Sequence, residues 1–252
     1  MSKSGEKRKF AAFDIDGTIF RWQLYHELFD ELSIAGYIDD DDKQSVLHAR
    51  ETWSTRQGSF IDYEEILVFV MEKHVIGLPE QVVKDLTMRI LSAKGHRTYA
   101  YTRNLMHELR DAGYFIIAIS GSYQQLVEAF AELHHIDLAI GTNYELEDGK
   151  FVRKGRTVFG QKGHILSTAV EEHGLTFEGS YAVGDSGSDG AMMELVDHPI
   201  AFNPDEKLFK IAQEHGWKVV IERKNMMYEL EMPKGDSKEG HGTYVLAHAK
   251  SR

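Results

Sequence analysis

Asp14 and Asp16 stand two residues apart near the start of the chain, directly before Gly17. They follow a short apolar run, residues 10–13, that predicts a buried strand, along which alternate side chains point the same way. Two like charges held this close repel each other unless a cation lies between them or a proton is shared. The glycine lets the chain turn sharply away from the strand end. The stretch predicts metal-assisted chemistry, and the alternative is a simple Asp-Gly turn.

A second acidic loop argues against the simple turn. Asp185 and Asp189 follow another apolar run, residues 181–183. In open parallel sheets, ligands bind outside the carboxyl ends of the strands. We therefore expect the two acidic loops to form one site.

A hydroxyl and a lysine complete the set. Ser120 and Gly121 end the apolar run 114–119 and lead into a predicted helix, where free N–H groups and the helix dipole favour a phosphate. Lys162 lies near the start of a helix that we expect to run to about Glu172. A lone lysine is usually a solvated surface group, so the meaning of this one comes from the order of all four motifs.

In this order the motifs resemble those of the haloacid dehalogenase superfamily of phosphohydrolases, subfamily IB, the branch that contains phosphoserine phosphatases. Residues 14–18 match its Asp-x-Asp-Gly-Thr motif, and residues 184–189 match its Gly-Asp-x-x-x-Asp motif. Ser120 matches the strand-end Ser or Thr, and Lys162 matches the family lysine. The resemblance extends from about Phe10 to about Val220.

The resemblance implies a role for each residue. Asp14 would be the nucleophile that forms an aspartyl-phosphate, and Asp16 would be the general acid and then the base. Ser120 and the Gly121 N–H would bind phosphate oxygens. Lys162 would bridge the nucleophile and the phosphoryl group.

The resemblance also implies a magnesium ion. The Asp14 carboxylate, the Asp16 carbonyl and Asp185 would hold it, a sparse oxygen set that suits this ion. The ion would screen the repulsion between an anionic nucleophile and an anionic substrate. Thr18 would steady the loop, and Asp189 would orient the lysine or the metal-bound waters.

The expected activity is that of a phosphoric monoester hydrolase acting on a small soluble phosphate ester. In phosphoserine phosphatases a glutamate nine positions after the nucleophile recognises the substrate's amino group. Here that position holds Gln23, a neutral amide that cannot pair with an ammonium as a carboxylate does. Arg50 and Arg56 are candidates for binding a substrate carboxylate or second phosphate, or are solvated helix residues.

Other functions stay open beside this one. They are phosphoserine phosphatase activity proper, and a phosphotransferase that passes the phosphoryl group to a second alcohol. A non-catalytic phosphate-binding module would lack at least one catalytic group, whereas all are present. A dehalogenase would not need Asp16. Three aromatic residues, Trp22, Trp53 and Tyr63, either line a substrate pocket or pack in the core.

The expected fold class is α/β, a Rossmann-like core domain with a parallel sheet and an inserted helical cap domain. Residues 1–19 and 95–222 would form the core, and residues 20–94 the cap, which we expect to open and close over the site. Residues 223–252 would be a C-terminal extension. We expect a β-hairpin there, which extends the sheet or makes a dimer contact, or else a frayed tail.

Composition excludes several classes of protein. The net charge of −11 argues against nucleic-acid binding, and the absence of cysteine excludes disulfides and thiolate metal sites. No run approaches membrane-spanning length, and the basic first nine residues do not form a secretory signal. We therefore expect a cytoplasmic enzyme with a small-molecule partner, either a monomer or a homodimer.

Overall fold

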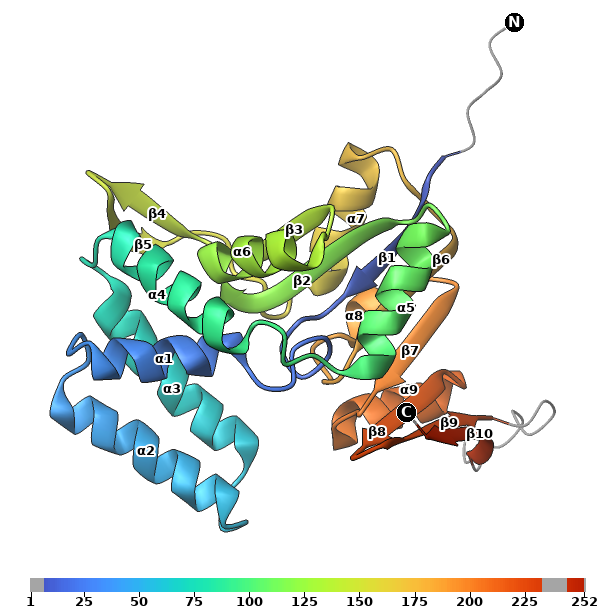
Figure 1. Ribbon diagram of the computed structural model, residues 1–252, viewed down its shortest axis with the longest axis horizontal. Coiled ribbons are helices and arrows are strands. Elements are labelled where there is room, and N and C mark those ends of the chain that lie inside the picture. Colours follow the sequence, from blue (N-terminus) through green and yellow to red (C-terminus); the bar gives the residue numbers. More distant parts are fainter. Residues whose placement is uncertain (1–6, 233–243, 252) are drawn as a thin grey trace, which may run out of the picture.

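The computed structural model describes residues 7–232 and 244–251. Within them an eight-stranded sheet has the order β10-β9-β8-β7-β6-β1-β2-β3 (Figure 1). Neighbours from β8 to β3 pair in parallel, whereas β9 and β10 are antiparallel. The strands are β1 (Lys9–Phe13), β2 (Phe115–Tyr123), β3 (Leu138–Thr142), β6 (Thr176–Gly184), β7 (His198–Phe202), β8 (Lys218–Arg223), β9 (Met226–Glu231) and β10 (Val245–Ser251).

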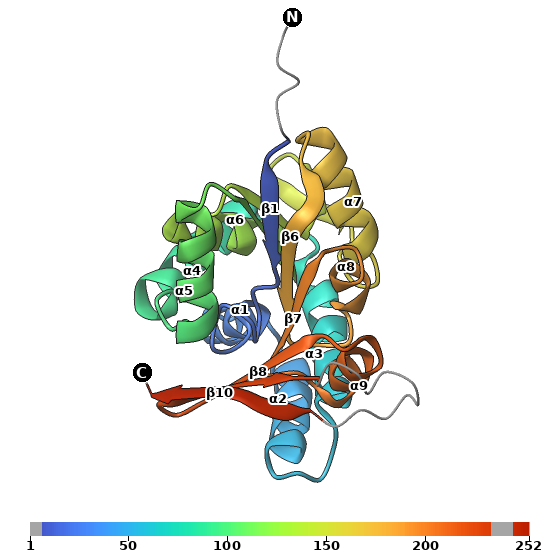
Figure 2. The same cartoon turned by 90° about the vertical axis from the view of Figure 1, so that its right-hand side faces the viewer.

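Both faces of the central strands are covered by helices (Figure 2). On one face lie α5 (Ala100–Asp111) and α6 (Gln124–His134), and on the other lie α7 (Lys162–Glu172), α8 (Gly190–Met193) and α9 (Glu206–His215). The apolar run in β1 divides between two cores: Ala11 and Phe13 face one, and Phe10 and Ala12 face the other. A strand buried on both sides needs such a continuous apolar run.

Four helices are inserted between β1 and β2: α1 (Leu24–Ile34), α2 (Asp40–Ser54), α3 (Phe60–Val75) and α4 (Glu80–Lys94). They form a group beside the sheet (Figure 1). The two connections to this group pair with each other, since Arg21 N donates to Arg97 O at 2.8 Å and Tyr99 N donates to Ile19 O at 2.9 Å. This arrangement confirms the predicted fold class, a Rossmann-like α/β sheet with a helical insertion.

A hairpin contacts the inserted helices. Its strands are β4 (Tyr144–Glu147) and β5 (Lys150–Lys154), and it turns at Asp148 and Gly149. Phe151 exchanges backbone hydrogen bonds with the loop before α4, donating to Leu78 O and accepting from Gly77 N. The hairpin therefore ties a later part of the chain to the helical group.

The predicted boundary between the strand at Ser120 and the helix after it was wrong by a few residues. The strand expected to end at Ser120 continues to Tyr123, so the helix expected from Ser122 begins at Gln124. α5 begins only at Ala100, because residues 97–99 are held extended by pairing with residues 19–21.

The C-terminal extension adds to the sheet. β9 pairs with β8, and β10 pairs with β9. The polar turn and the first residues of the second expected strand, at 233–243, lie outside the described residues. Among the helices that the structure describes, none has the length and apolar character needed to cross a bilayer.

Candidate active site

Lys162 stands between two carboxylates. Its Nζ lies 2.6 Å from Asp14 Oδ1 and 2.5 Å from Asp189 Oδ1, and all three side chains are buried. Asp14 follows β1 and Asp189 precedes α8, so the neighbouring carboxyl ends of β1 and β6 bring the pair together. Burial opposes the charge on Lys162, but the two carboxylates outweigh it and raise the pKa of the ammonium group. The lysine therefore stays charged.

The second oxygen of Asp14 is free. Asp14 Oδ2 is buried and has no hydrogen-bond partner among the described residues. Burial raises the pKa of Asp14 to about 7, with Lys162 opposing and the charges of Asp189 and Asp16 adding to the rise. An unpartnered buried carboxylate oxygen is costly unless a ligand completes it.

Asp16 accepts three hydrogen bonds. Ser120 Oγ and Ser122 Oγ donate to its Oδ2 at 2.6 and 2.8 Å, and Leu24 N, in the first turn of α1, donates to its Oδ1 at 2.5 Å. Burial nevertheless raises the pKa of Asp16, and these hydrogen bonds limit the rise. The Ser120 hydroxyl, a predicted phosphate ligand, is thus occupied by a carboxylate in this structure.

Ser122 was missed as a site residue. It is buried and reaches Asp16 because β2 continues past Ser120, so that residues 120 and 122 share one face of the strand. The alternation Ser-Gly-Ser was the available signal, but the predicted helix start at Ser122 concealed it. Gly121, between them, is exposed, and a Cβ added there would meet no atom within 4 Å.

Asp185 is positioned from two sides. Thr18 Oγ1 donates to its Oδ1 at 3.2 Å, and Thr102 Oγ1 in turn donates to Thr18 O at 2.8 Å. The Asp185 N–H donates to Asp189 Oδ2 at 3.1 Å. Burial raises the pKa of Asp185 well above its ordinary value, and the neighbouring Asp14 charge adds to this rise.

These residues fit a divalent cation. Oxygens of Asp14, Asp185 and Asp189 all lie within 4.8 Å of one another. Both oxygens of Asp189 already bind the lysine or backbone N–H groups, which leaves Asp14 Oδ2 and Asp185 as the donors. Three carboxylates face one ammonium group, so a further positive charge is needed, and an all-oxygen set suits Mg²⁺. The Asp16 carbonyl stays a predicted ligand.

Glycine is required beside this cluster. Gly17 has φ +83°, and a Cβ there would lie 2.1 Å from Asp185 Oδ2. A Cβ on Gly184 would lie 2.4 Å from Asp189 Cβ. Any side chain at either position would displace one of the acidic groups.

The comparison with protein families decides the family. Residues 11–194, well over half of the chain, match the haloacid dehalogenase-like hydrolases. The chain belongs to this family. A phosphoserine phosphatase of Archaeoglobus fulgidus is 28% identical over 217 residues, which cover 84% of this chain and 57% of that relative. The hydrolase thus spans little more than half the length of this relative.

Solved structures share the fold of this haloacid dehalogenase-like hydrolase. A protein of unknown function from Bordetella pertussis Tohama I has a TM-score of 0.68 at 20% identity, covering 85% of this chain and 98% of that one. A phospho-aspartyl intermediate analogue of phosphoserine phosphatase has a TM-score of 0.59 at 20% identity, covering 87% and 95%. At these identities the likeness shows the fold alone.

The predicted specificity residues of the hydrolase have different surroundings. Gln23 is the half-buried N-cap residue of α1, and its side chain makes no capping hydrogen bond. Arg50 is already engaged, since it donates to both oxygens of Asp30, at 2.8 and 3.2 Å, and to Tyr63 OH at 2.8 Å. Arg56 is exposed and has φ +64° just after α2. Of the two arginines, Arg56 is the one whose guanidinium group has no partner among the residues that the structure describes.

The predicted aromatic residues pack against one another. Trp22 stacks on Trp53, with ring centroids 5.8 Å apart, and Trp53 stacks on Tyr63 at 5.7 Å. Tyr63 is buried, whereas the two tryptophans are half-buried. His26 lies among these rings and contacts Trp22 and Tyr63. The cluster therefore belongs to the core of the helical group, and its two tryptophans are partly exposed at the edge of that core.

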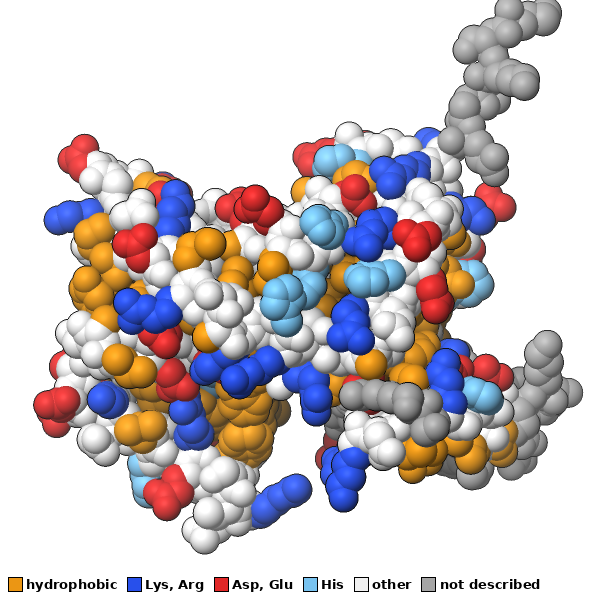
Figure 3. Space-filling model, in the orientation of Figure 1, with side chains coloured by type: hydrophobic (Ala, Val, Ile, Leu, Met, Phe, Trp, Pro, Cys, Tyr) orange, Lys and Arg blue, Asp and Glu red, His pale blue; other side chains and the backbone are white. Residues whose placement is uncertain are grey.

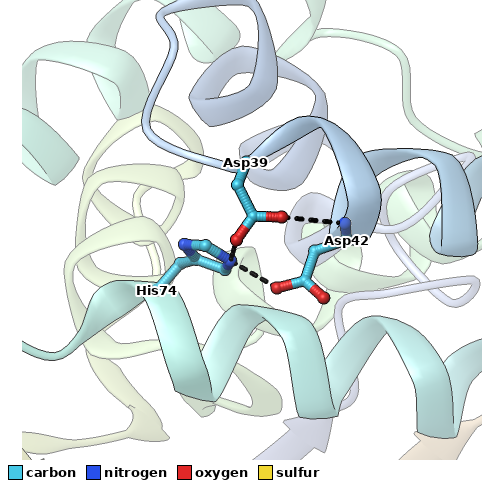
Figure 4. Close-up of side chains that lie close together, drawn as sticks. All are labelled: Asp39, Asp42 and His74. Carbon is cyan, nitrogen blue, oxygen red and sulfur yellow. Dashed lines mark hydrogen bonds and ion pairs between the residues drawn. The ribbon is translucent and has the colours of Figure 1, made fainter.

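A second cluster of ligand-type residues joins α2 to α3 (Figure 4). Asp39 Oδ1 accepts from Asp42 N at 2.9 Å and so caps α2. His74 Nε2 lies 2.6 Å from Asp42 Oδ2, and Lys73 Nζ also lies 2.6 Å from that oxygen. The hydrogen bond from Lys73 lowers the pKa of Asp42. Lys73 is a counter-charge for both carboxylates, so we assign the cluster to helix–helix contact.

Proposed function

We propose that this hydrolase is a Mg²⁺-dependent phosphatase that cleaves a small-molecule phosphate monoester through an aspartyl-phosphate. One observation carries the proposal: Lys162 fixes one oxygen of Asp14 and leaves the other buried and unpartnered. The names of the Archaeoglobus fulgidus relative and of the phospho-aspartyl structure support the same chemistry.

The residues divide the reaction between them. A carboxylate oxygen of Asp14 attacks phosphorus, the bond from phosphorus to the alcohol oxygen breaks, and Asp16 gives its proton to that oxygen. Water then attacks the phosphorus of the aspartyl-phosphate, Asp16 takes a proton from it, and Asp14 is released with inorganic phosphate. Lys162 neutralises charge on the nucleophile and on the transferred group.

The metal and the phosphate ligands complete the site. A bound Mg²⁺, held by Asp14 and Asp185, would supply positive charge against the phosphoryl oxygens. Ser120 and the Gly121 N–H bind phosphate oxygens, so the Ser120 hydroxyl must leave Asp16 when phosphate enters. Asp189 keeps Lys162 in place, and Thr18 keeps Asp185 in place.

The helical insertion, residues 20–94, serves as the cap. In the space-filling view a hollow lies between these helices and the β8–β10 end of the sheet, below the loop that leaves β1 (Figures 1 and 3). The paired connections, residues 19–21 and 97–99, are the points about which the cap moves. Closure would exclude bulk water and select the alcohol part of a small cytoplasmic ester.

The test is hydrolysis of para-nitrophenyl phosphate with Mg²⁺ and with a chelator. We expect metal-dependent turnover that Asp14→Asn abolishes and that Asp111→Asn, at an exposed carboxylate on α5, leaves intact. Acid quenching with labelled substrate should trap a phosphoenzyme that hydroxylamine cleaves and that Asp14→Asn lacks. Turnover that persists in Asp14→Asn would refute the proposal. Added alcohols that intercept the phosphoryl group would point to a phosphotransferase.

A further inference from the structure

Four half-buried residues form a row along α3. They recur every fourth position and so lie next to one another along one side of the helix: Phe60, Glu64, Val68 and Glu72. The row borders the buried face that contains Tyr63. Two of its members are acids, separated by two turns of helix.

The C-terminal end of this row contacts the β4–β5 hairpin. Glu72 forms an ion pair with Lys154 of β5, in the hairpin that packs beside the inserted helices (Figure 1). Glu64 lies two turns earlier, toward the start of α3. The preceding turn of α3 packs against α1, since the rings of Phe60 and His26 have centroids 5.8 Å apart. The first turn of α1 in turn donates to Asp16 of the candidate active site through Leu24 N, and the charges of Asp16 and Lys162 act on Glu64. The helix thus directs one acid at the hairpin and the other at the catalytic groups.

Glu64 differs from Glu72 in having no ion-pair partner in the described part of the chain. Among the residues that the structure describes, none forms an ion pair or a hydrogen bond with its carboxylate. Burial raises the pKa of Glu64, the Asp16 charge raises it further, and Lys162 opposes both. Taking a carboxylate partly out of water without a partner is unfavourable. A cation from outside the chain would remove that cost.

We infer that Glu64 binds a positively charged group on the alcohol part of the substrate, so that the site selects phosphate monoesters of amino alcohols. The inference rests on the proposed phosphatase function. The neutral Gln23 does not supply a negative charge for such a group. Arg50 is bound to Asp30 and offers no free guanidinium group to a substrate carboxylate, and Arg56 lies at an exposed position after α2. A substrate with an anionic end would instead be repelled by Glu64.

Three phosphate esters of similar length test whether the charge of the alcohol part, rather than its size, determines the rate of hydrolysis. They are O-phosphoethanolamine, 2-hydroxyethyl phosphate and phosphoglycolate, which end in an ammonium, a hydroxyl and a carboxylate. We expect kcat/KM of the wild type to fall in that order. Loss of a charge-assisted contact should make Glu64→Gln about 10- to 100-fold slower on phosphoethanolamine, with no loss on the other two. Glu65→Gln, the exposed neighbour on α3, should behave as the wild type.

Turnover of para-nitrophenyl phosphate distinguishes the outcomes. If Glu64→Gln keeps it and loses the ammonium preference, the inference holds. An equal loss of kcat/KM on all three esters, or a wild type that hydrolyses the aryl ester but shows no ammonium preference, refutes the role of Glu64 and leaves the phosphatase proposal intact. A wild type that hydrolyses none of the four esters under any divalent metal refutes both.

Discussion

The Ser120 hydroxyl donates to Asp16 Oδ2 across 2.6 Å, and Ser122 donates to the same oxygen at 2.8 Å. The carboxylate of the proposed acid thus holds the hydroxyl that is proposed to bind phosphate. Substrate must compete with Asp16 for Ser120, while Ser122 can keep its contact. The two serines should therefore differ in what their removal does.

Alanine at each serine tests this difference. Ser122→Ala removes one hydrogen bond to Asp16, worth ~1 kcal/mol, so we expect kcat to fall about fivefold with little change in the inhibition constant of inorganic phosphate. Ser120→Ala should lower kcat and also raise that inhibition constant. Steady-state kinetics with phosphate as inhibitor separates the two, and equal inhibition constants in both variants would contradict the assignment of Ser120.

Gly17 offers a matched pair with Gly113. Both have positive φ, +83° and +89°, so alanine should cost ~1–2 kcal/mol at either from backbone strain alone. Only at Gly17 would the new Cβ meet Asp185, whereas Gly113 has no atom within 4 Å of that place.

We therefore expect Gly17→Ala to lose Mg²⁺-dependent turnover and Gly113→Ala to keep it. Urea unfolding and turnover of an aryl phosphate measure the two effects. If both variants were equally active, Asp185 would not need its present position.

The sequence was informative where chemistry is local. Asp14 and Lys162 belong to short motifs at element ends, and the parallel pairing of β1 with β6 was enough to bring Asp14 and Asp189 together. Glu64 carries no such signal, and the Ser-Gly-Ser alternation at Ser122 is informative only once the length of the strand is known. Ser122 depends on how far β2 extends, and Glu64 depends on how α3 packs against the rest of the chain, which no local pattern encodes.

The burial of His26 should make the folded protein less stable at acidic pH. Its ring is buried, neither nitrogen has a partner among the described residues, and burial, assisted by Arg50, lowers its pKa to about 3. At a pH below the ordinary histidine pKa of about 6.5, His26 binds a proton in the unfolded chain but stays neutral in the folded protein. Stability is therefore lost as pH falls from about 6.5 toward 3.

Replacement of His26 by phenylalanine should remove this loss. We expect His26→Phe to gain ~2 kcal/mol over the wild type on going from pH 7.5 to pH 5. His48→Phe, at an exposed position of α2, is the control. The free energy of unfolding in urea at both pH values gives the answer, and a gap that does not change with pH would show that His26 is protonated in the folded protein.

Lys162 should support both stability and activity. It is the ion-pair partner of two buried carboxylates, so Lys162→Met leaves Asp14 and Asp189 without their counter-charge. Breaking a buried pair in this way costs ~3–5 kcal/mol, which urea unfolding in a chelator should detect. Because the proposed Mg²⁺ would also neutralise Asp14, the loss should be smaller with the metal present.

A second substitution distinguishes the role of Lys162 as a counter-charge in the fold from its role in the reaction. Adding Asp189→Asn to Lys162→Met removes one of the stranded charges, so part of the lost stability should return, as a coupling in the double-mutant cycle. Turnover should not return, because the nucleophile and the transferred group still lack the ammonium. If activity recovered together with stability, Lys162 would act only by holding Asp14 and Asp189 in the fold, and its proposed contact with the phosphoryl group would be wrong.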